Sequence, residues 1–222
     1  MANAPTGGGI FLPNGYVNNF NSASPTGQID AYGLIYPSGS NVGKMIELGD
    51  NEAANATAPG TPAANTLLGG AYQIVLLDSS ATAATCVAGN AAYIKLNQNG
   101  QTAGTLPETG FSTISVTDYA HRDATNLTAG VFINPATLNG FANTPTPGNY
   151  IIIFVGAGRC AVNVLTAAST AIGGAVNSGS TGGGFDTATT SSILTVGTAV
   201  TVPAASSTAV AYFPNIFYRL RP

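Results

Sequence analysis

The chain has 222 residues, of which 7% are charged and 45% are hydrophobic, and its formal net charge is −3. An average soluble domain carries about 25% charged residues, so this protein must build its surface from neutral Ala, Ser, Thr, Asn and Gly side chains. Its 6 Lys and Arg are too few and too spread out for the basic surface that displaces counterions from phosphates, which excludes direct nucleic-acid binding.

Apolar residues occur in strand-length runs such as Ile74–Leu77 and Tyr150–Val155. None approaches the ~20 residues that a membrane helix needs, so no membrane partner is expected. Nine Tyr and nine Phe indicate a packed fold rather than a disordered chain. Met1–Gly7 lacks the basic and apolar regions of a secretory signal. We therefore expect a soluble protein that is made in a cytoplasm.

Two cysteines, Cys86 and Cys160, are far apart in the sequence and neither belongs to a CxxC motif. They provide no thiolate cluster for a metal. We expect two free, buried thiols, with a disulfide as the less favoured alternative. No metal or other cofactor is predicted.

Three regions are predicted along the chain. Residues 1–41 combine Gly and Asn with isolated aromatics, among them Phe11, Tyr16 and Phe20, and cannot close a core alone, so they are expected to form an arm over another surface. Residues 42–120 are a β-rich region with long loops, and residues 121–222 are a β-domain.

Strand-length segments separated by turn residues predict an all-β fold, an antiparallel sandwich or a barrel-like domain. The predicted strands are Tyr72–Leu77, Ala92–Leu96, Phe111–Val116, Gly130–Ile133, Tyr150–Val155, Arg159–Val164, Ile193–Val196, Ala199–Val202, Thr208–Phe213 and Asn215–Leu220.

The clearest local pattern lies between Tyr150 and Val164. The Gly156-Ala157-Gly158 segment can adopt positive φ and predicts a hairpin between the two flanking strands. The second strand alternates, with Cys160, Val162 and Val164 on its apolar face. The first strand, which includes Ile152, is apolar on both faces and must be covered by a second layer of the chain or by another subunit.

In the last predicted strand, Phe217, Arg219 and Arg221 share one side. One interpretation is a solvated edge that its charges protect from aggregation. The other is an interface at which the two arginines make bidentate contacts with a partner. Phe217, Arg219 and Arg221 are therefore candidate interface residues, together with Phe11, Tyr16, Phe20 and Ile152.

Catalytic chemistry would depend on the single imidazole, His121, in the polar segment Asp118–Asp123. A hydrolase triad orients one imidazole between a nucleophile and a carboxylate, but no nucleophile motif accompanies this histidine. We favour a local turn network for it. Gly182–Gly184 lacks the Lys-Ser or Lys-Thr pair of a phosphate-binding loop, and the nine carboxylates form no evident pair. The sequence predicts a protein that is not an enzyme.

The segments Ala129–Phe132, Pro147–Val155, Gly158–Val162, Ala171–Val176 and Val196–Val200 resemble the small β-domain of tailed-bacteriophage head decoration proteins. The resemblance covers roughly the C-terminal half of the chain and rests on turn glycines and alternating strands. It implies a cement protein on the outer surface of the virion capsid, a homo-oligomer and typically a trimer, which binds the major capsid protein between capsomers. The longer N-terminal region departs from the simplest members.

Two other functions compete with this expectation. One is a host-recognition module of a phage tail or bacterial surface that binds glycans through Tyr and Asn loops, although Trp, the strongest sugar-stacking residue, is absent. The other is an enzyme that uses His121 or a carboxylate pair, and it has no supporting motif.

Overall fold

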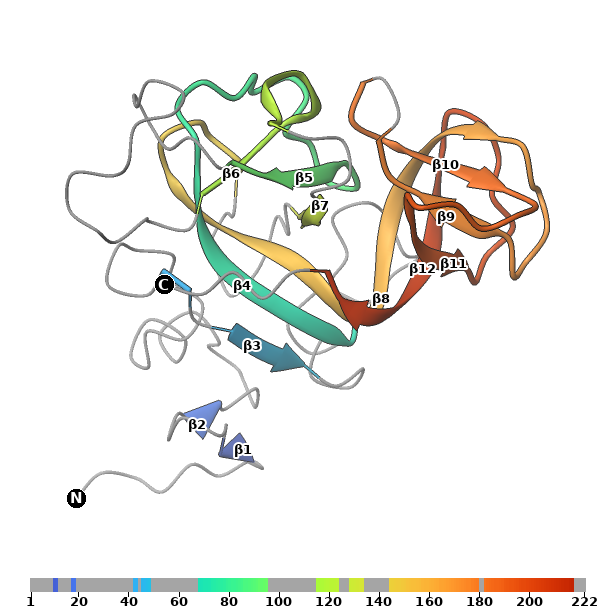
Figure 1. The fold of residues 1–222 in the computed structure, drawn as a ribbon. Coiled ribbons are helices and arrows are strands. Elements are labelled where there is room, and N and C mark those ends of the chain that lie inside the picture. The colour runs from blue at the N-terminus through green and yellow to red at the C-terminus, as the bar shows by residue number, and fades with distance from the viewer. Residues whose placement is uncertain are drawn as a thin grey trace.

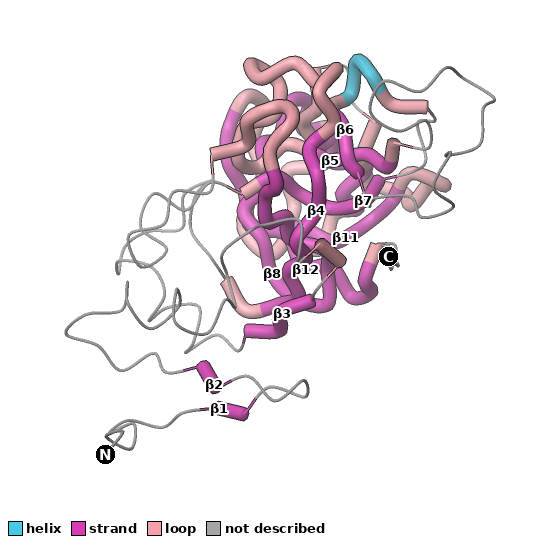
Figure 2. The backbone as a smooth tube through the Cα atoms, turned by 90° about the vertical axis from the view of Figure 1, so that its left-hand side faces the viewer, coloured by secondary structure: helices cyan, strands magenta, loops and turns pink. Residues whose placement is uncertain are grey.

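A computed structural model of the chain describes residues 10–11, 17–18, 42–43, 45–48, 68–95, 115–123, 128–133, 144–179 and 182–217. Strands dominate these residues, and the one helix among them is a short 3-10 turn, η2 (Tyr119–His121) (Figure 2). The all-β prediction is confirmed. The strands are β1 (Ile10–Phe11), β2 (Val17–Asn18), β3 (Met45–Leu48), β4 (Gly70–Leu77), β5 (Ala91–Ile94), β6 (Ser115–Thr117), β7 (Thr128–Phe132), β8 (Tyr150–Ala167), β9 (Ala175–Asn177), β10 (Phe185–Ala188), β11 (Thr195–Ala199) and β12 (Ser207–Ile216).

The long strand β8 belongs to two closed rings of strands, which lie side by side in Figure 1. In the first ring, its N-terminal half pairs with β4 on one edge and with β7 on the other. The pairs β7–β5, β5–β6 and β6–β4 complete the circle, and only the last of these is parallel. β3 extends the sheet beyond β4.

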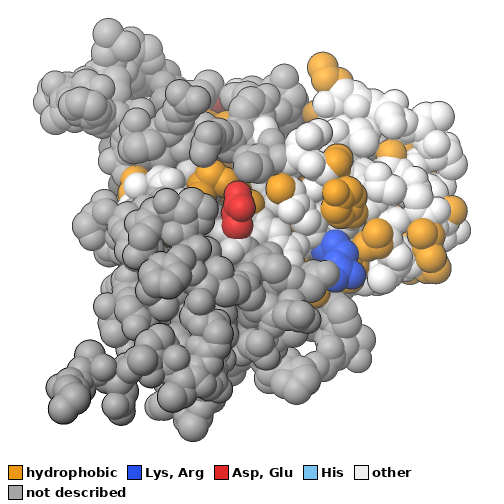
Figure 3. Space-filling model, turned by 90° about the horizontal axis from the view of Figure 1, so that it is seen from below, with side chains coloured by type: hydrophobic (Ala, Val, Ile, Leu, Met, Phe, Trp, Pro, Cys, Tyr) orange, Lys and Arg blue, Asp and Glu red, His pale blue; other side chains and the backbone are white. Residues whose placement is uncertain are grey.

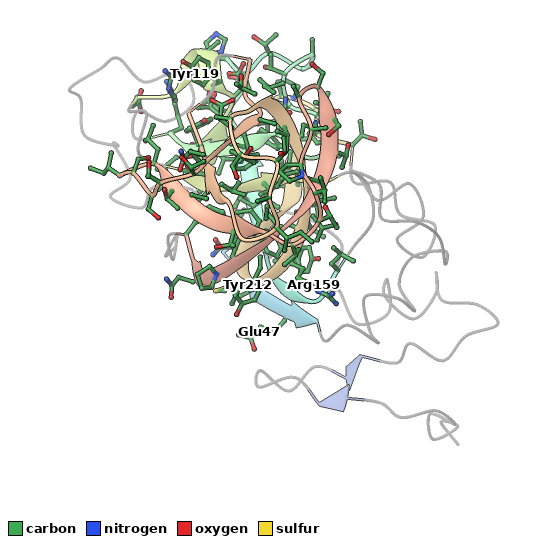
Figure 4. All side chains as sticks on the ribbon, turned by 90° about the vertical axis from the view of Figure 1, so that its right-hand side faces the viewer. Glu47, Tyr119, Arg159 and Tyr212 are labelled. Atoms are coloured by element: carbon green, nitrogen blue, oxygen red, sulfur yellow. The ribbon has the colours of Figure 1, made fainter. Side chains whose placement is uncertain are left out.

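The C-terminal half of β8 closes the second ring. It pairs with β12, and the circle continues through β11, β9 and β10. β10 then returns to β8 in parallel orientation. Figure 4 looks toward this ring. Because closure pairs each strand with two neighbours, the ring avoids the open edges on which sheets aggregate.

The predicted hairpin between Tyr150 and Val164 is wrong, because the chain continues through Gly156–Gly158 as one strand. Positive φ does occur there, at Gly156 (116°) and Ala157 (51°), but it produces a bend rather than a reversal. The partner of the second half is β12, whose Tyr212 lies opposite Arg159. The expected antiparallel pairing exists, with a different strand.

Close crossing of the backbone explains the glycine at position 158. A Cβ there would lie 2.1 Å from the Gly69 carbonyl oxygen and 2.4 Å from the Gly70 Cα, so no side chain fits. At the same level, the β8–β12 register shifts between Phe213 and Ile216. This bulge accommodates Pro214, which has no N–H to contribute to the ladder.

Both faces of the first half of β8 are covered within the chain. Ile151, Ile153 and Val155 belong to one core cluster, with residues from β4 to β7. Ile152 and Phe154 belong to a second cluster, which also includes the interior of the second ring. The sequence allowed this strand to be covered by a second layer of the same chain or by another subunit, and in the structure it is covered by the same chain.

Alternation in the second half of β8 is confirmed. Cys160, Val162 and Val164 all lie in the core of the second ring. Toward the C-terminus, the single strand β11 replaces the two predicted strands Ile193–Val196 and Ala199–Val202. Likewise, within the residues that the structure describes, β12 replaces the two predicted strands Thr208–Phe213 and Asn215–Leu220. The sequence did not predict the strands β1, β2, β3, β9 and β10.

The expected domain division between residues 120 and 121 falls inside the first ring, between β6 and β7. The rings instead meet at the bend of β8. The arm expected at residues 1–41 lies outside the described residues except for the short antiparallel pair β1–β2. In the described part of the chain, no helix combines the length and the hydropathy required to cross a membrane.

Candidate functional site

The polar segment around His121 forms a network centred on the buried carboxylate of Asp118, which is 1% exposed. Its Oδ1 lies 2.7 Å from Nδ1 of His121, and its Oδ2 accepts a hydrogen bond of 2.5 Å from the Thr85 hydroxyl. Burial by itself raises the pKa of Asp118, but hydrogen bonds from Thr85, His121 and the backbone of Thr82, together with the charge interaction with His121, outweigh burial, and the pKa is lowered. The carboxylate is therefore held in its charged form.

The outer side of this network ties η2 to β5. Lys95 follows β5 and donates to the His121 carbonyl oxygen at 2.9 Å and to Asp123 Oδ1 at 3.2 Å. The guanidinium of Arg122 lies 3.4 Å from the centre of the Tyr119 ring, close enough for a cation–π contact. These contacts fix the turn between β6 and β7.

Chemically, the arrangement differs from a hydrolase triad. A triad places the imidazole between the hydroxyl and the carboxylate, whereas here the carboxylate of Asp118 lies between Thr85 and His121. In the part of the chain that the structure describes, no three His, Cys, Asp or Glu side chains are grouped to bind a metal ion. The geometry fits a network that stabilises a turn, as expected from the sequence.

The two thiols are free and buried, which confirms the favoured prediction over the disulfide. Cys86 belongs to the core of the first ring and Cys160 to that of the second. Burial raises the pKa of Cys86 to about 12 and also raises that of Cys160. Both side chains pack as small apolar groups.

Among the predicted interface residues, the structure describes the side chains of Ile152 and Phe217. Ile152 is 2% exposed and lies in the core, so it offers no surface to a partner. Phe217 packs against Phe213 with ring centroids 5.0 Å apart. Tyr16, Phe20, Arg219 and Arg221 lie outside the described residues, and Phe11 is described only as part of the backbone of β1.

A different surface, on the second ring, exposes apolar side chains. Ile172, Ile193 and Val202 are 64%, 88% and 65% exposed and lie in the β8–β9, β10–β11 and β11–β12 loops. From residue 144 to residue 217, Arg159 and Asp186 are the two charged residues in the sequence. The right-hand part of Figure 3 accordingly shows hydrophobic side chains scattered over a surface that is largely uncoloured. We call the outside of the second ring, with its loops, the second-ring surface; the loop that holds Ile172 lies beside Ala199, whereas Leu194, next to Ile193, lies beside Ser178 at the other end of β9.

Tyr212 and Arg159 are cross-strand neighbours on the outside of the second ring. Figure 4 shows them together, on the opposite side of the view from Tyr119. Tyr212 is 45% exposed, whereas Ala211 and Phe213, the residues before and after it in β12, are buried in the core. Tyr and Arg are the residue types that interfaces enrich. The alternation of β12 could have identified Tyr212 from the sequence, whereas Ile172 and Ile193 lie in Gly- and Ser-rich loops without periodicity.

Comparisons with protein-family models, curated proteins and solved structures find no match to this chain.

Proposed function

We propose that this chain is a structural protein that decorates the outer surface of a tailed-bacteriophage head and binds the major capsid protein between capsomers. The resemblance of its turn glycines and alternating strands to those of head decoration proteins suggests the shell. The observation that carries the proposal is the second-ring surface, because it exposes apolar side chains and has few charges. Such a surface can be covered by another protein without desolvating ion pairs.

Closure of both rings favours docking by surface contact over the addition of strands. The pairs β10–β8 and β4–β8 close the two rings, so within each ring the strand edges are already satisfied. Low charge also favours crowding, since many copies on one shell do not accumulate like-charge repulsion. Modest contacts at each copy add up when the shell is gripped at many sites.

Self-association is the second part of the proposal, with a trimer as the expected state because threefold sites on an icosahedral shell match a threefold oligomer. Since Ile152 is buried in the chain's own core, the contact between copies is assigned instead to the exposed cross-strand pair Tyr212 and Arg159, and the loops that hold Ile172 and Ile193 are assigned to the shell. Light scattering of the purified protein measures the oligomer directly, and a monomer that also fails to bind shells contradicts both parts of the proposal.

Shell binding is tested by cosedimentation with purified phage heads that lack their own decoration protein. Replacing Ile172 and Ile193 together by Asp places charge on the second-ring surface and should abolish binding. Tyr150→Asp is the matched control, because Tyr150 is also exposed, at 37%, but lies at the far end of β8 in the first ring. Equal binding of both variants would refute the assignment of the surface.

A further inference from the structure

A groove of about 520 Å³ lies between the loop before β5 and the second ring, beyond the bend of β8. Asn163, Val164 and Leu165 of β8 line it, together with residues from each of the rings. The loop before β5 contributes Val87 and Asn90, the start of β12 contributes Ser207 and Thr208, and Ser206 and Gly182 complete the lining. The volume falls within the ~300–1,000 Å³ of typical small-molecule sites.

No lining residue is ionisable and none is aromatic. A phosphate, a nucleotide or a carboxylate would lose its hydration without gaining a countercharge, and a planar aromatic ligand would find no ring to stack against. Amide and hydroxyl groups alternate instead with the aliphatic side chains of Val87 and Leu165. This combination matches the hydroxyl and C–H groups of a sugar ring.

The amide groups of the groove are held in fixed orientations. Asn163 Nδ2 donates to the Ala88 carbonyl oxygen at 2.8 Å and to Asn90 Oδ1 at 3.0 Å. Asn90 Nδ2 donates to the carbonyl oxygens of Thr85, at 2.9 Å, and Gly182, at 3.4 Å. A Cβ at Gly89 would lie 2.8 Å from the Asn163 amide, so the packing also locks it. A preorganised site loses little conformational entropy when a ligand binds.

Hydrogen-bonding capacity remains at the rim. Thr208 Oγ1 reaches Asn163 Oδ1 only at 3.4 Å, a long contact that a ligand hydroxyl can replace. The Ser206 hydroxyl has no hydrogen bond to any described residue, and its backbone is held at a φ of 54°. Left-handed backbone at a residue other than glycine carries strain, and such positions gather at functional sites.

We propose that this groove binds a neutral saccharide, such as one end of a host glycan. Thr208 and Ser206 donate to the sugar hydroxyls, Asn163 Oδ1 accepts from one of them, and Val87 contacts the apolar face of the ring. Because no aromatic ring stacks on the sugar, each site is weak, and many copies on one particle would bind a glycan-coated surface through avidity. The site does not depend on the capsid role, since it lies within one chain.

The test is an NMR titration of the isotope-labelled full chain with the methyl glycosides of glucose, galactose and N-acetylglucosamine. We expect at least one of them to shift the amide signals of residues 87–90, 163–165 and 206–208, with millimolar affinity. Galacturonic acid, which carries a charge, should bind more weakly than galactose. A neutral peptide is the competing probe, and shifts in the groove with the peptide alone would overturn the proposal.

Variants separate specific binding from general contact. Thr208→Val removes one hydroxyl and should weaken binding by about twofold to tenfold, the value of one hydrogen bond. Val87→Asp should abolish binding of neutral sugars. Thr198→Val is the matched control, since Thr198 is exposed on the second ring outside the groove. If no neutral sugar shifts the groove signals, or if Thr208→Val and Val87→Asp both bind as the native protein does, the proposal is wrong, whatever the shell-binding result.

Discussion

The aromatic side chains of Phe154 and Phe213 pack with their centroids 5.4 Å apart. This contact joins the first closed ring of strands to the second. Phe154 comes from the half of β8 that pairs in the first ring, and Phe213 from β12 in the second. Tyr72 packs edge-on against Phe154 at 5.5 Å and Phe185 against Phe213 at 6.3 Å. One aromatic cluster therefore runs from the outside of the first ring into the core of the second.

Replacing Phe213 by Ala should lower the free energy of unfolding by about 3–5 kcal/mol, because a fully buried ring is removed and a cavity remains. Urea unfolding measures the change. Tyr212→Ala is the matched control, because Tyr212 is the adjacent residue and points outward, and in protein dilute enough to be monomeric its loss should cost less than about 1 kcal/mol. Similar losses for the two variants would contradict the assigned orientation of β12.

Gly158→Ala should destabilise the protein by about 1–3 kcal/mol or more, because the new Cβ would lie 2.1 Å from the Gly69 carbonyl oxygen. Ala157→Gly provides a test in the opposite direction. Ala157 has a φ of 51°, so glycine should be neutral or stabilise by up to ~1 kcal/mol. Thermal unfolding compares them. If the segment were a hairpin loop open to solvent, Gly158→Ala would cost little.

Asp118→Asn should lower the free energy of unfolding at neutral pH by about 1–3 kcal/mol, since the charged carboxylate accepts hydrogen bonds from Thr85 and His121. The folded pKa of Asp118 is lowered from its usual 3.8. Its contribution is therefore complete above the unfolded pKa and is lost as the pH falls through the folded pKa. Urea unfolding of both proteins, repeated at falling pH, should show the gap close below about pH 4, and a gap that widened in acid would contradict this.

Cys86 and Cys160 should resist a thiol reagent in the native protein and react once the chain is unfolded in denaturant. Both side chains are buried, and the pKa of each is raised, to about 12 for Cys86, so little thiolate is present. A disulfide reagent releases a coloured thiolate each time it reacts with a cysteine, so the absorbance counts the reactive cysteines. Rapid reaction of the native protein, or reaction after unfolding only when a reductant is added, would contradict free, buried thiols.

The all-β class and many of the strands were predictable because β-branched and aromatic runs such as Tyr150–Val155 have a strong local preference. The course of the chain at Gly156–Gly158 was not predictable, because a glycine-rich triplet is compatible with a chain reversal and with a bend within one strand. The choice depends on β12, a distant strand whose pairing leaves no local signal. The same limit affected the candidate site. Ile152 was assigned to an interface because nothing in its own segment shows that the second ring covers it.

Electron cryo-microscopy of the particle that carries this chain tests the central claim most directly. The account predicts density for both rings on the outer face of the head, between capsomers at threefold or quasi-threefold positions, with the loops that hold Ile172 and Ile193 against a neighbouring protein. Density located in a tail fibre, or chains seated on the shell with the second-ring surface fully in solvent, would contradict it.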